Sequence, residues 1–409
     1  MKIAFLTRFY EPVIGAGSLR ITSFVKFLSK NKNYKIDIIT EFPNYPAGII
    51  DEKYKGKFIS IEEHDNVKIH RLYCYSSPKG NFITRVLNEI SFFFSSFFYV
   101  IKFRGHDFLI ISSPPFVLLF NLFWMKIFHT RPKIIVDIRD LHPDTAIEPG
   151  YLKNKLLIKI LYKIEKLVYK YADCIFTVTN TLKHRILKKI RLNSQKIFVL
   201  SNGADLDYFY NRGDKNSLRE KLGWNKDKFI VLYTGSLSIM DDMQILIEAA
   251  NLLKNQSDIQ FIIMGHGYLK QELVDLANEF NLDNVIFLDN SYRKRLAEML
   301  SAADIGFVNK IDLELTRGHL PVKMFEYCAC NLPFIACLDG ETKDFIEKYN
   351  IGFYSPPGDY KKLAEKILYL KNNKDLIKKD NRYYEVIEKY YSREIIANKL
   401  KDILESLDR

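Results

Sequence analysis

The sequence predicts an α/β protein with two doubly wound domains, each built on a mostly parallel sheet. Short β-branched runs alternate with longer helical patterns along the chain, and the runs are almost continuously apolar. Such runs are typical of parallel strands covered on both faces. The rhythm restarts after "SNG" at residues 201–203. A length of 409 residues also exceeds one ordinary core and favours two domains.

The predicted strands of the first half are separated mostly by helical patterns such as 18–31 and 181–190. These strands span residues 2–9, 35–41, 67–73, 107–113, 133–139, 173–179 and 196–201, and those of the second half span 229–235, 259–265, 284–289, 304–309 and 333–338. We expect domains at 1–202 and 203–390, joined near 202–225. A last helical segment, 391–409, is left unplaced. Because ligands bind at the carboxyl ends of such strands, we expect the two domains to face each other across a cleft that holds the site.

The net charge of +12 is concentrated in residues 151–200, which hold twelve Lys or Arg and two acids. Within this segment, "YLKNKLLIKILYKIEKLVYKY" predicts a basic amphipathic helix. One interpretation is a solvated face over a core stripe. The other is contact with an anionic membrane surface, since lipid headgroups attract polybasic segments. No nucleic-acid recognition motif accompanies the charge, so we expect no nucleic-acid partner.

Two segments at 91–103 and 114–128 are unusually aromatic. Each is shorter than the ~20 apolar residues of a membrane span. They predict either helices packed in the core or an exposed apolar face that dips into a bilayer, and no transmembrane span is expected.

The five cysteines show no paired spacing, and the chain opens directly on a predicted strand, "MKIAFLTRF". These features favour reduced thiols, no zinc site and no signal peptide. We therefore expect a cytoplasmic protein. The basic and aromatic segments would place it at the inner face of the cell membrane, and neither a metal nor a cofactor is expected.

The segment "GAGSLR" at 15–20 offers glycines before a helix. Gly15 and Gly17 would let backbone amides and a helix N-terminus meet a phosphate. The alternative is a flexible loop before a Ser18 N-cap. Arg20 stands where a dinucleotide fingerprint needs a third small residue, which weakens that interpretation.

Polar residues and glycines follow several predicted strands. Asp140, in "VDIRDLHPD", is a candidate acceptor-binding or catalytic carboxylate. Gly235 and the pair Gly265 and Gly267 follow two strands of the second half, where a ligand could approach the backbone closely. Polar strand ends that merely reach solvent are the alternative for Asp140.

The strongest motif is "GHLPVKMFEY" at 318–327. Pro321 suits the first turn of a helix, and amides near Leu320 would point at a ligand. Lys323 in that turn opposes the helix dipole, which suggests an anion. Glu326 either pairs with Lys323 on a surface or, given its apolar neighbours, is a buried carboxylate that needs donors such as ribose hydroxyls.

In their order, these segments resemble the retaining nucleotide-sugar glycosyltransferases of the GT-B fold, often called family four. The resemblance rests on "YEPVIGAGSLR", "LSNGADLDYF", "FIIMGHGYLKQEL", "PVKMFEYCACNLPFIA" and "GFYSPPGD". "EFPNYPAG" and "RDLHPD" are similar to bacterial transferases that build O-antigen and capsule repeats, including those handling fucosamine.

The resemblance implies roles for particular residues. Glu326 would hold the donor ribose, and Gly235, Gly265, Gly267 and the segment around Leu320 would lie against the donor. Our own hypothesis, which the resemblance does not supply, is that Lys323 and the amides near Gly15 and Gly17 meet the donor phosphates.

Four positions depart from the family. The usual first glutamate is Gly318, a basic pair that commonly meets the diphosphate falls on Ser236 and Asp241, and the usual acceptor-side histidine falls on Arg139.

The implied activity is transfer of a sugar, with retention, from a nucleoside diphosphate donor, expected to be UDP-linked. The acceptor would be a lipid-linked glycan of cell-surface polysaccharide synthesis. Two alternatives stay open: a sugar-nucleotide 2-epimerase of the same architecture, and a non-catalytic partner that rests on the membrane beside another transferase.

Overall fold

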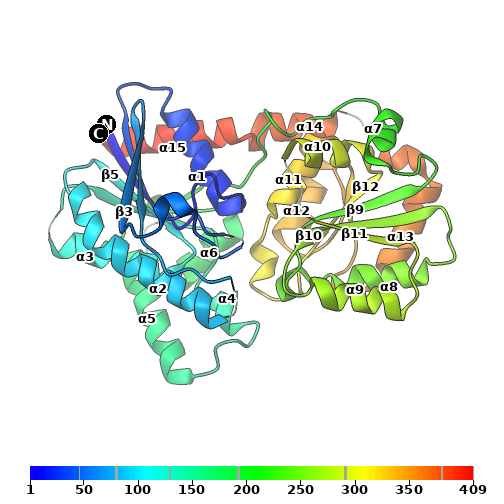
Figure 1. Ribbon diagram of the computed structural model, residues 1–409, viewed down its shortest axis with the longest axis horizontal. Coiled ribbons are helices and arrows are strands. Elements are labelled where there is room, and N and C mark those ends of the chain that lie inside the picture. The colour runs from blue at the N-terminus through cyan, green and yellow to red at the C-terminus, as the bar shows by residue number, and fades with distance from the viewer. Residues whose placement is uncertain are drawn as a thin grey trace. The chain divides into compact units, whose positions relative to one another are not determined.

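The structure is a computed structural model that describes residues 1–45, 47–78, 82–128, 130–190, 194–289, 293–378 and 381–408. The chain divides into two compact units (Figure 1). Unit 1 comprises Met1–Ser201 with Ile396–Arg409, and unit 2 comprises Asn202–Ile395. Pro46 of the "EFPNYPAG" segment lies outside the described residues.

Unit 1 contains, in its described residues, an eight-stranded sheet of order β3-β4-β2-β1-β5-β6-β7-β8. All neighbours are parallel except β3 and β4, which form an antiparallel pair at one edge. The strands are β1 Lys2–Leu6, β2 Lys35–Glu41, β3 Ile59–His64, β4 Val67–Leu72, β5 Phe108–Ser113, β6 Lys133–Ile138, β7 Cys174–Thr177 and β8 Ile197–Val199. β3 was not predicted, because it lies at the edge and its sequence, "ISIEEH", lacks a continuous apolar run.

The α-helices of unit 1 cover the sheet. They are α1 Ala16–Leu28, α2 Phe82–Tyr99, α3 Asn121–Ile127, α4 Asp144–Ile147, α5 Lys155–Tyr171 and α6 Asn180–Lys189, and short 3-10 turns occur at Glu52–Tyr54, Val100–Phe103, Phe116–Phe120 and Ser194–Lys196. α5 is the predicted basic amphipathic helix. Its start is fixed by the Asn154 side chain, which accepts a hydrogen bond from the backbone amide of Leu157.

The helix containing α2 is longer than the sequence suggested. It continues into the 3-10 turn, so that Ile83–Phe103 forms 21 helical residues, and among the described residues this one helix is long and apolar enough to cross a membrane. The expectation that this segment is too short for a span was therefore wrong. One third of the segment is buried in unit 1, and a core helix would pass the same test of length and composition.

Unit 2 contains, in its described residues, a six-stranded, fully parallel sheet of order β11-β10-β9-β12-β13-β14. Its strands are β9 Phe229–Ser236, β10 Ile259–His266, β11 Val285–Leu288, β12 Ile305–Asn309, β13 Phe334–Cys337 and β14 Phe353–Tyr354. Its helices are α7 Lys215–Leu222, α8 Gln244–Leu252, α9 Lys270–Glu279, α10 Arg293–Ala302, α11 Val322–Ala329, α12 Glu341–Tyr349, α13 Tyr360–Asn372 and α14 Arg382–Val386, with short turns at Ile239–Asp241, Thr316–Gly318, Lys374–Ile377 and Ile387–Tyr391.

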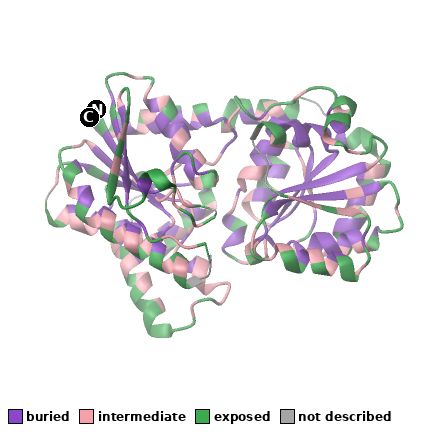
Figure 2. Cartoon of the chain, viewed as in Figure 1, coloured by how far each residue is buried: buried purple, intermediate pink, exposed green. Residues whose placement is uncertain are grey.

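The sheet of unit 2 has a separate apolar core on each face. Ile230 and Leu232 of β9 point into one core, with Met324 of α11. Val231 and Tyr233 point into the other, which α8 and α13 cover. Figure 2 shows these strands buried along most of their length. The predicted α/β class with two doubly wound sheets is confirmed.

The last helix, α15 Arg393–Asp408, begins in unit 2 and from Ile396 onward belongs to unit 1. Its side chains Ile396, Leu400 and Leu404 join the core that Ile3 and Phe5 of β1 form. This places the helix that the sequence left unplaced.

Candidate functional site

The carboxyl ends of β9, β10 and β12 and the start of α11 bring most of the predicted donor residues together in unit 2. β9 ends at Ser236, and β10 runs beside it with Gly265 opposite Gly235. β12, which pairs with the other side of β9, ends at Asn309. α11 begins at Val322 after Pro321. This edge of a parallel sheet is where doubly wound folds bind ligands.

α11 is locked against the sheet by Tyr327. The Tyr327 hydroxyl receives a hydrogen bond of 3.1 Å from the backbone amide of Thr234 and donates one of 3.3 Å to the carbonyl of Phe307. A Cβ on Gly306 would lie 2.5 Å from the Tyr327 ring, so glycine is needed there for the helix to approach. The positions of Lys323 and Glu326 on this helix are therefore fixed by contacts to β9 and β12.

Lys323 directs its ammonium group inward, beneath the end of β9. Its Nζ lies 3.8 Å from the centre of the Tyr233 ring and is buried without a hydrogen-bond partner in the described part of the chain. Burial lowers the pKa of Lys323 to about 7, a shift that the nearby carboxylate of Asp241 opposes. A buried amine without a partner is costly unless a ligand supplies one.

Glu326 and Leu320 are both buried, with 9% and 7% of their surface exposed. Because Lys323 makes no hydrogen bond among the described residues and Glu326 is buried, the alternative of a surface ion pair between them is wrong. Gly318, at the position of the family's first glutamate, is buried in a short 3-10 turn.

The structure also pairs Lys310 with Asp241, a contact that the sequence did not single out. Asp241 is 1% exposed, and its carboxylate receives hydrogen bonds from Lys310 at 2.7 Å, Ser236 at 2.5 Å and Ser238 at 2.6 Å. Burial alone would raise the pKa of Asp241, but the charges of Lys310 and Lys323 outweigh it and lower the pKa to about 2. The signal in the sequence was a lysine directly after a predicted strand, "DIGFVNK".

Each predicted glycine of unit 2 has a reason to be glycine in this structure. Gly235 has a φ of +147°, and a Cβ there would lie 2.7 Å from Nζ of Lys323. A Cβ on Gly265 would lie 2.0 Å from the carbonyl oxygen of Gly235, and one on Gly267 would lie 2.1 Å from that of Leu237. Gly265 and Gly267 therefore let β10 and its loop lie close to β9, whatever role they have toward a donor.

In unit 1 the structure brings the "GAGSLR" and "VDIRDLHPD" segments together. Gly15 is the N-cap of α1, and a Cβ on Gly17 would lie 2.2 Å from a guanidinium nitrogen of Arg139. Asp140 follows Arg139 directly, after the end of β6, and is partly exposed. The alternative of an N-cap at Ser18 is wrong, since α1 begins two residues earlier and buries Ser18 in its first turn.

Arg20 has a structural role that explains its departure from a dinucleotide fingerprint. Its guanidinium makes two hydrogen bonds of 3.0 Å to the buried carboxylate of Asp137 and donates to the carbonyls of Leu200 and Ser201. These contacts tie α1 to β6 and to the segment where the chain leaves unit 1.

Potential metal ligands do not gather in the described residues, where no group of three or more His, Cys, Asp or Glu side chains has the geometry to hold a metal ion. All five cysteines are buried free thiols.

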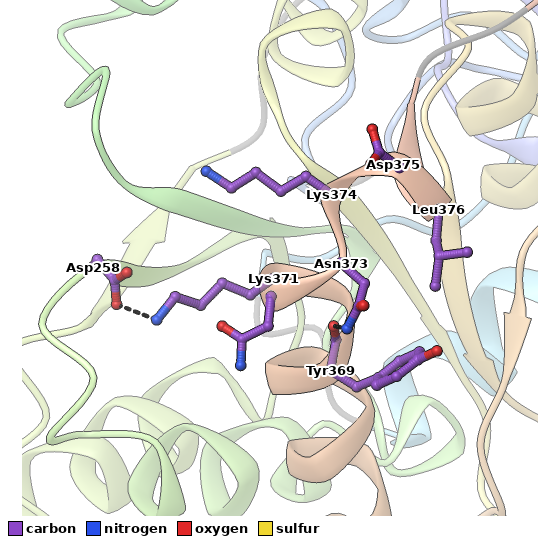
Figure 3. Close-up of a pocket in the computed structure, with 8 residues that line it drawn as sticks. Asp258, Tyr369, Lys371, Asn373, Lys374, Asp375 and Leu376 are labelled. Carbon is purple, nitrogen blue, oxygen red and sulfur yellow. Dashed lines mark hydrogen bonds and ion pairs between the residues drawn. The ribbon is translucent and has the colours of Figure 1, made fainter.

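A surface pocket lies elsewhere in unit 2, between the end of α13 and the residue before β10 (Figure 3). Lys371 of α13 forms an ion pair of 2.6 Å with Asp258 there. Since Asp258 immediately precedes the first residue of β10, this pocket is at the amino edge of the sheet, opposite the Lys323 site. None of the predicted site residues lines it.

Residues 214–390, nearly all of unit 2, match the family of glycosyl transferases group 1. Unit 2 is a group 1 glycosyltransferase domain. The residues around Lys323 therefore lie at the carboxyl edge of the sheet of this domain, and the resemblance to glycosyltransferases of the GT-B fold is confirmed.

Two of the relatives of this chain carry descriptions that name an acceptor. One is chitobiosyldiphosphodolichol beta-mannosyltransferase of Debaryomyces hansenii, 25% identical over 58% of this chain and 55% of that protein. Another is N-acetylgalactosamine-N,N'-diacetylbacillosaminyl-diphospho-undecaprenol 4-alpha-N-acetylgalactosaminyltransferase of Campylobacter jejuni, 27% identical over 56% of this chain and 59% of that protein. The match thus spans little more than half the length of each relative.

A solved structure resembles this chain over almost its whole length. HepE of Anabaena, in complex with UDP and glucose, is 16% identical, covers 99% of this chain and 100% of its own, and superposes with a TM-score of 0.70. The likeness shows the GT-B fold.

Proposed function

We propose that this protein is a retaining glycosyltransferase that moves a sugar from a UDP-linked donor to a lipid-linked glycan of cell-surface polysaccharide synthesis. The observation that carries the proposal is Lys323, a buried amine without a hydrogen-bond partner in the described residues, at the ligand-binding edge of a group 1 glycosyltransferase domain. A negatively charged ligand would relieve the cost of burying that amine.

The donor's diphosphate is assigned to Lys323 and its ribose to Glu326. When the bond between the sugar and the diphosphate breaks, the bonding electrons leave with UDP, so negative charge grows on the phosphate oxygens. A cation and backbone amides that are already in place stabilise this charge without reorganising. Glu326, buried on a helix that Tyr327 holds rigid, would accept hydrogen bonds from the ribose hydroxyls.

The acceptor side is assigned to unit 1. Asp140, beside Arg139, is the candidate carboxylate for binding the acceptor or accepting its proton, and the amides near Gly15 and Gly17 are candidates for the donor phosphates. The named acceptors of the two relatives are carried on dolichyl and undecaprenyl diphosphate, which supports a lipid-linked acceptor here.

A peripheral position on the membrane fits the surface of unit 1. Five exposed apolar side chains of the α2 segment recur every three or four residues and form a stripe: Ile83, Leu87, Ile90, Phe94 and Phe98. Neighbouring helices add exposed Ile127, Leu156 and Ile160, and α5 contributes exposed lysines. A solvated apolar stripe beside a polybasic helix is the pattern of a surface that rests on anionic lipid.

The proposal is tested by incubating the purified protein with UDP-glucose, UDP-N-acetylglucosamine, UDP-N-acetylgalactosamine and GDP-mannose, each with and without bacterial membrane extract. We expect one UDP-sugar to yield UDP and a labelled lipid only when extract is present, with the anomeric configuration of the donor retained. Donor conversion without extract would identify an epimerase, and no turnover with any donor would contradict the transferase activity.

A further inference from the structure

We propose that Lys310 is a second cation for the donor's diphosphate, and that Asp241 is the positioning residue that holds it in the site beside Lys323. This inference rests on the proposed function and names a further phosphate-binding group for it. It also assigns a purpose to an acid that stands where the family commonly has a base.

Asp241 is held rigidly enough to position another side chain. The Asp241 carboxylate accepts hydrogen bonds from the hydroxyls of Ser236 and Ser238 in addition to the one from Lys310. Its backbone is fixed from β12, because the side-chain amide of the fully buried Asn309 donates to the carbonyls of Asp241 and Asp242 at 3.3 and 2.8 Å. Asp242 has a φ of +45°, so the turn following Asp241 is a specific backbone conformation held by Asn309.

Lys310 has capacity left for a ligand. It directly follows β12, its side chain is 19% exposed, and one of its three N–H groups is used by Asp241. Both amines adjoin the end of β9: Asp241, the partner of Lys310, accepts a hydrogen bond from the Ser236 hydroxyl, and Nζ of Lys323 lies 2.7 Å from where a Cβ on the adjacent Gly235 would be. The carboxylate of Asp241 interacts with both amines, since the charges of Lys310 and Lys323 each lower its pKa.

The exposure of its two members distinguishes the Lys310–Asp241 pair from an ordinary structural ion pair in the same unit. The Lys371–Asp258 pair is drawn in Figure 3. Its lysine is 13% exposed and its acid is 52% exposed. In the Lys310–Asp241 pair the order is reversed, with the acid 1% exposed and the lysine 19% exposed, so that the lysine is the more accessible member. When the acid of a pair is buried and the lysine is its more accessible member, an arriving ligand meets the positive charge first, which suits an anionic ligand.

The experiment compares binding of UDP with binding of uridine, by calorimetry, in the full chain. We expect Lys310→Met to weaken the binding of UDP at least tenfold. The affinity for uridine should be unchanged, because uridine has no phosphates for Lys310 to contact. Lys310→Arg should retain most of the affinity. Asp241→Asn should weaken UDP severalfold, because the amide keeps the Ser236 and Ser238 contacts but no longer fixes the Lys310 charge. Lys371→Met is the matched control and should bind UDP as the wild type does.

Folding is followed in each variant by thermal melting. Lys310→Gln, which keeps a donor for Asp241 without the charge, replaces Lys310→Met if that variant melts far below the wild type. Wild-type affinity for UDP in both neutral variants would overturn the role of Lys310, and an unchanged Asp241→Asn would overturn the role of Asp241. If the wild type binds no UDP, the proposed function and this inference both fail.

Discussion

The ammonium nitrogen of Lys323 lies 3.8 Å from the centre of the Tyr233 ring, with no hydrogen-bond partner in the described residues. The ring face attracts a cation but accepts no strong hydrogen bond from it. Tyr233 in turn donates its hydroxyl to the carbonyl of Ser236 at 2.6 Å, so the ring cannot move without breaking a contact at the end of β9. Lys323 is thus held ready for a ligand.

Removing the Lys323 amine should abolish most of the glycosyl transfer and leave the fold intact. We expect Lys323→Met to lower kcat by about 10² to 10³, the usual loss when one group that stabilises the leaving charge is removed. The melting temperature should stay level or rise, because a buried amine without a partner is replaced by an apolar side chain of similar length. Turnover is measured as UDP release, with Lys371→Met as control. Unchanged turnover would contradict the phosphate assignment.

The depressed pKa of Lys323 makes stability depend on pH in a defined window. The folded pKa is about 7 and the ordinary value is 10.5. Below pH 7 both states carry the proton and the cost of burying it is fully present. Between pH 7 and 10.5 the unfolded chain binds more protons, so the free energy of unfolding rises with pH by up to about 1.4 kcal/mol per unit.

Urea unfolding from pH 6 to 9 measures this dependence. The difference in unfolding free energy between wild type and Lys323→Met isolates the one lysine from other titrating groups. As the pH rises above 7, the unfolding free energy of the wild type should increase relative to that of Lys323→Met. A difference that is constant across this range would show that Lys323 keeps its ordinary pKa.

Gly235→Ala should disturb the site more than a glycine substitution of equal backbone cost. Gly235 has a φ of +147° and Gly213 one of +119°, yet a Cβ on Gly213 would meet nothing within 4 Å. Both alanine variants should lose about 1 to 2 kcal/mol of stability from the backbone. The Gly235 variant should also lose UDP affinity, because its methyl group displaces Lys323. Equal UDP affinity in the two variants, by calorimetry, would contradict this.

The apolar stripe on α2 should govern attachment to lipid. Wild-type protein is expected to sediment with vesicles of phosphatidylglycerol and phosphatidylethanolamine at low salt and to leave them at high salt, since charge contacts are screened. Phe94→Ser with Phe98→Ser should reduce the bound fraction severalfold. Tyr369→Ser, which removes an equally exposed ring from unit 2, is the control. Failure of the wild type to bind at low salt would remove the membrane surface from the proposal.

The Arg20–Asp137 pair should be a large contributor to the stability of unit 1. Arg20→Met leaves the buried Asp137 carboxylate without its guanidinium, and loss of one partner of a buried pair costs about 3 to 5 kcal/mol. Arg20→Met combined with Asp137→Leu should recover much of that loss, because no uncompensated charge remains. Urea unfolding of the two variants checks this; an equal loss in both would mean that packing, and not charge, dominates at this position.

The strands were predictable because parallel strands buried on both faces carry continuous apolar runs, as "FIVLY" in β9 does. The edge strand β3 alternates polar residues and was missed, and β14, Phe353–Tyr354, is too short to form a pattern. The length of α2 was missed because Thr84, Arg85, Asn88 and Glu89 interrupt the apolar run, although the helix passes through them.

The site was predictable only where its signal is local. Lys323 and Glu326 stand on one helix, and their apolar neighbours indicated burial. The contact between Lys310 and Asp241 joins residues 69 positions apart, so no local pattern carries it. Likewise the need for glycine at position 17 depends on the guanidinium of Arg139, which the fold brings from a distant strand end.

The path of α15 has a consequence for the order in which the chain can fold on the ribosome. Unit 1 is started by the first residues, yet Ile396, Leu400 and Leu404 belong to its core. Those side chains are synthesised only after all of unit 2, so unit 1 must wait with part of its core open while unit 2 completes. Domains that emerge first usually fold first; in this protein the second unit to begin is the first that can finish.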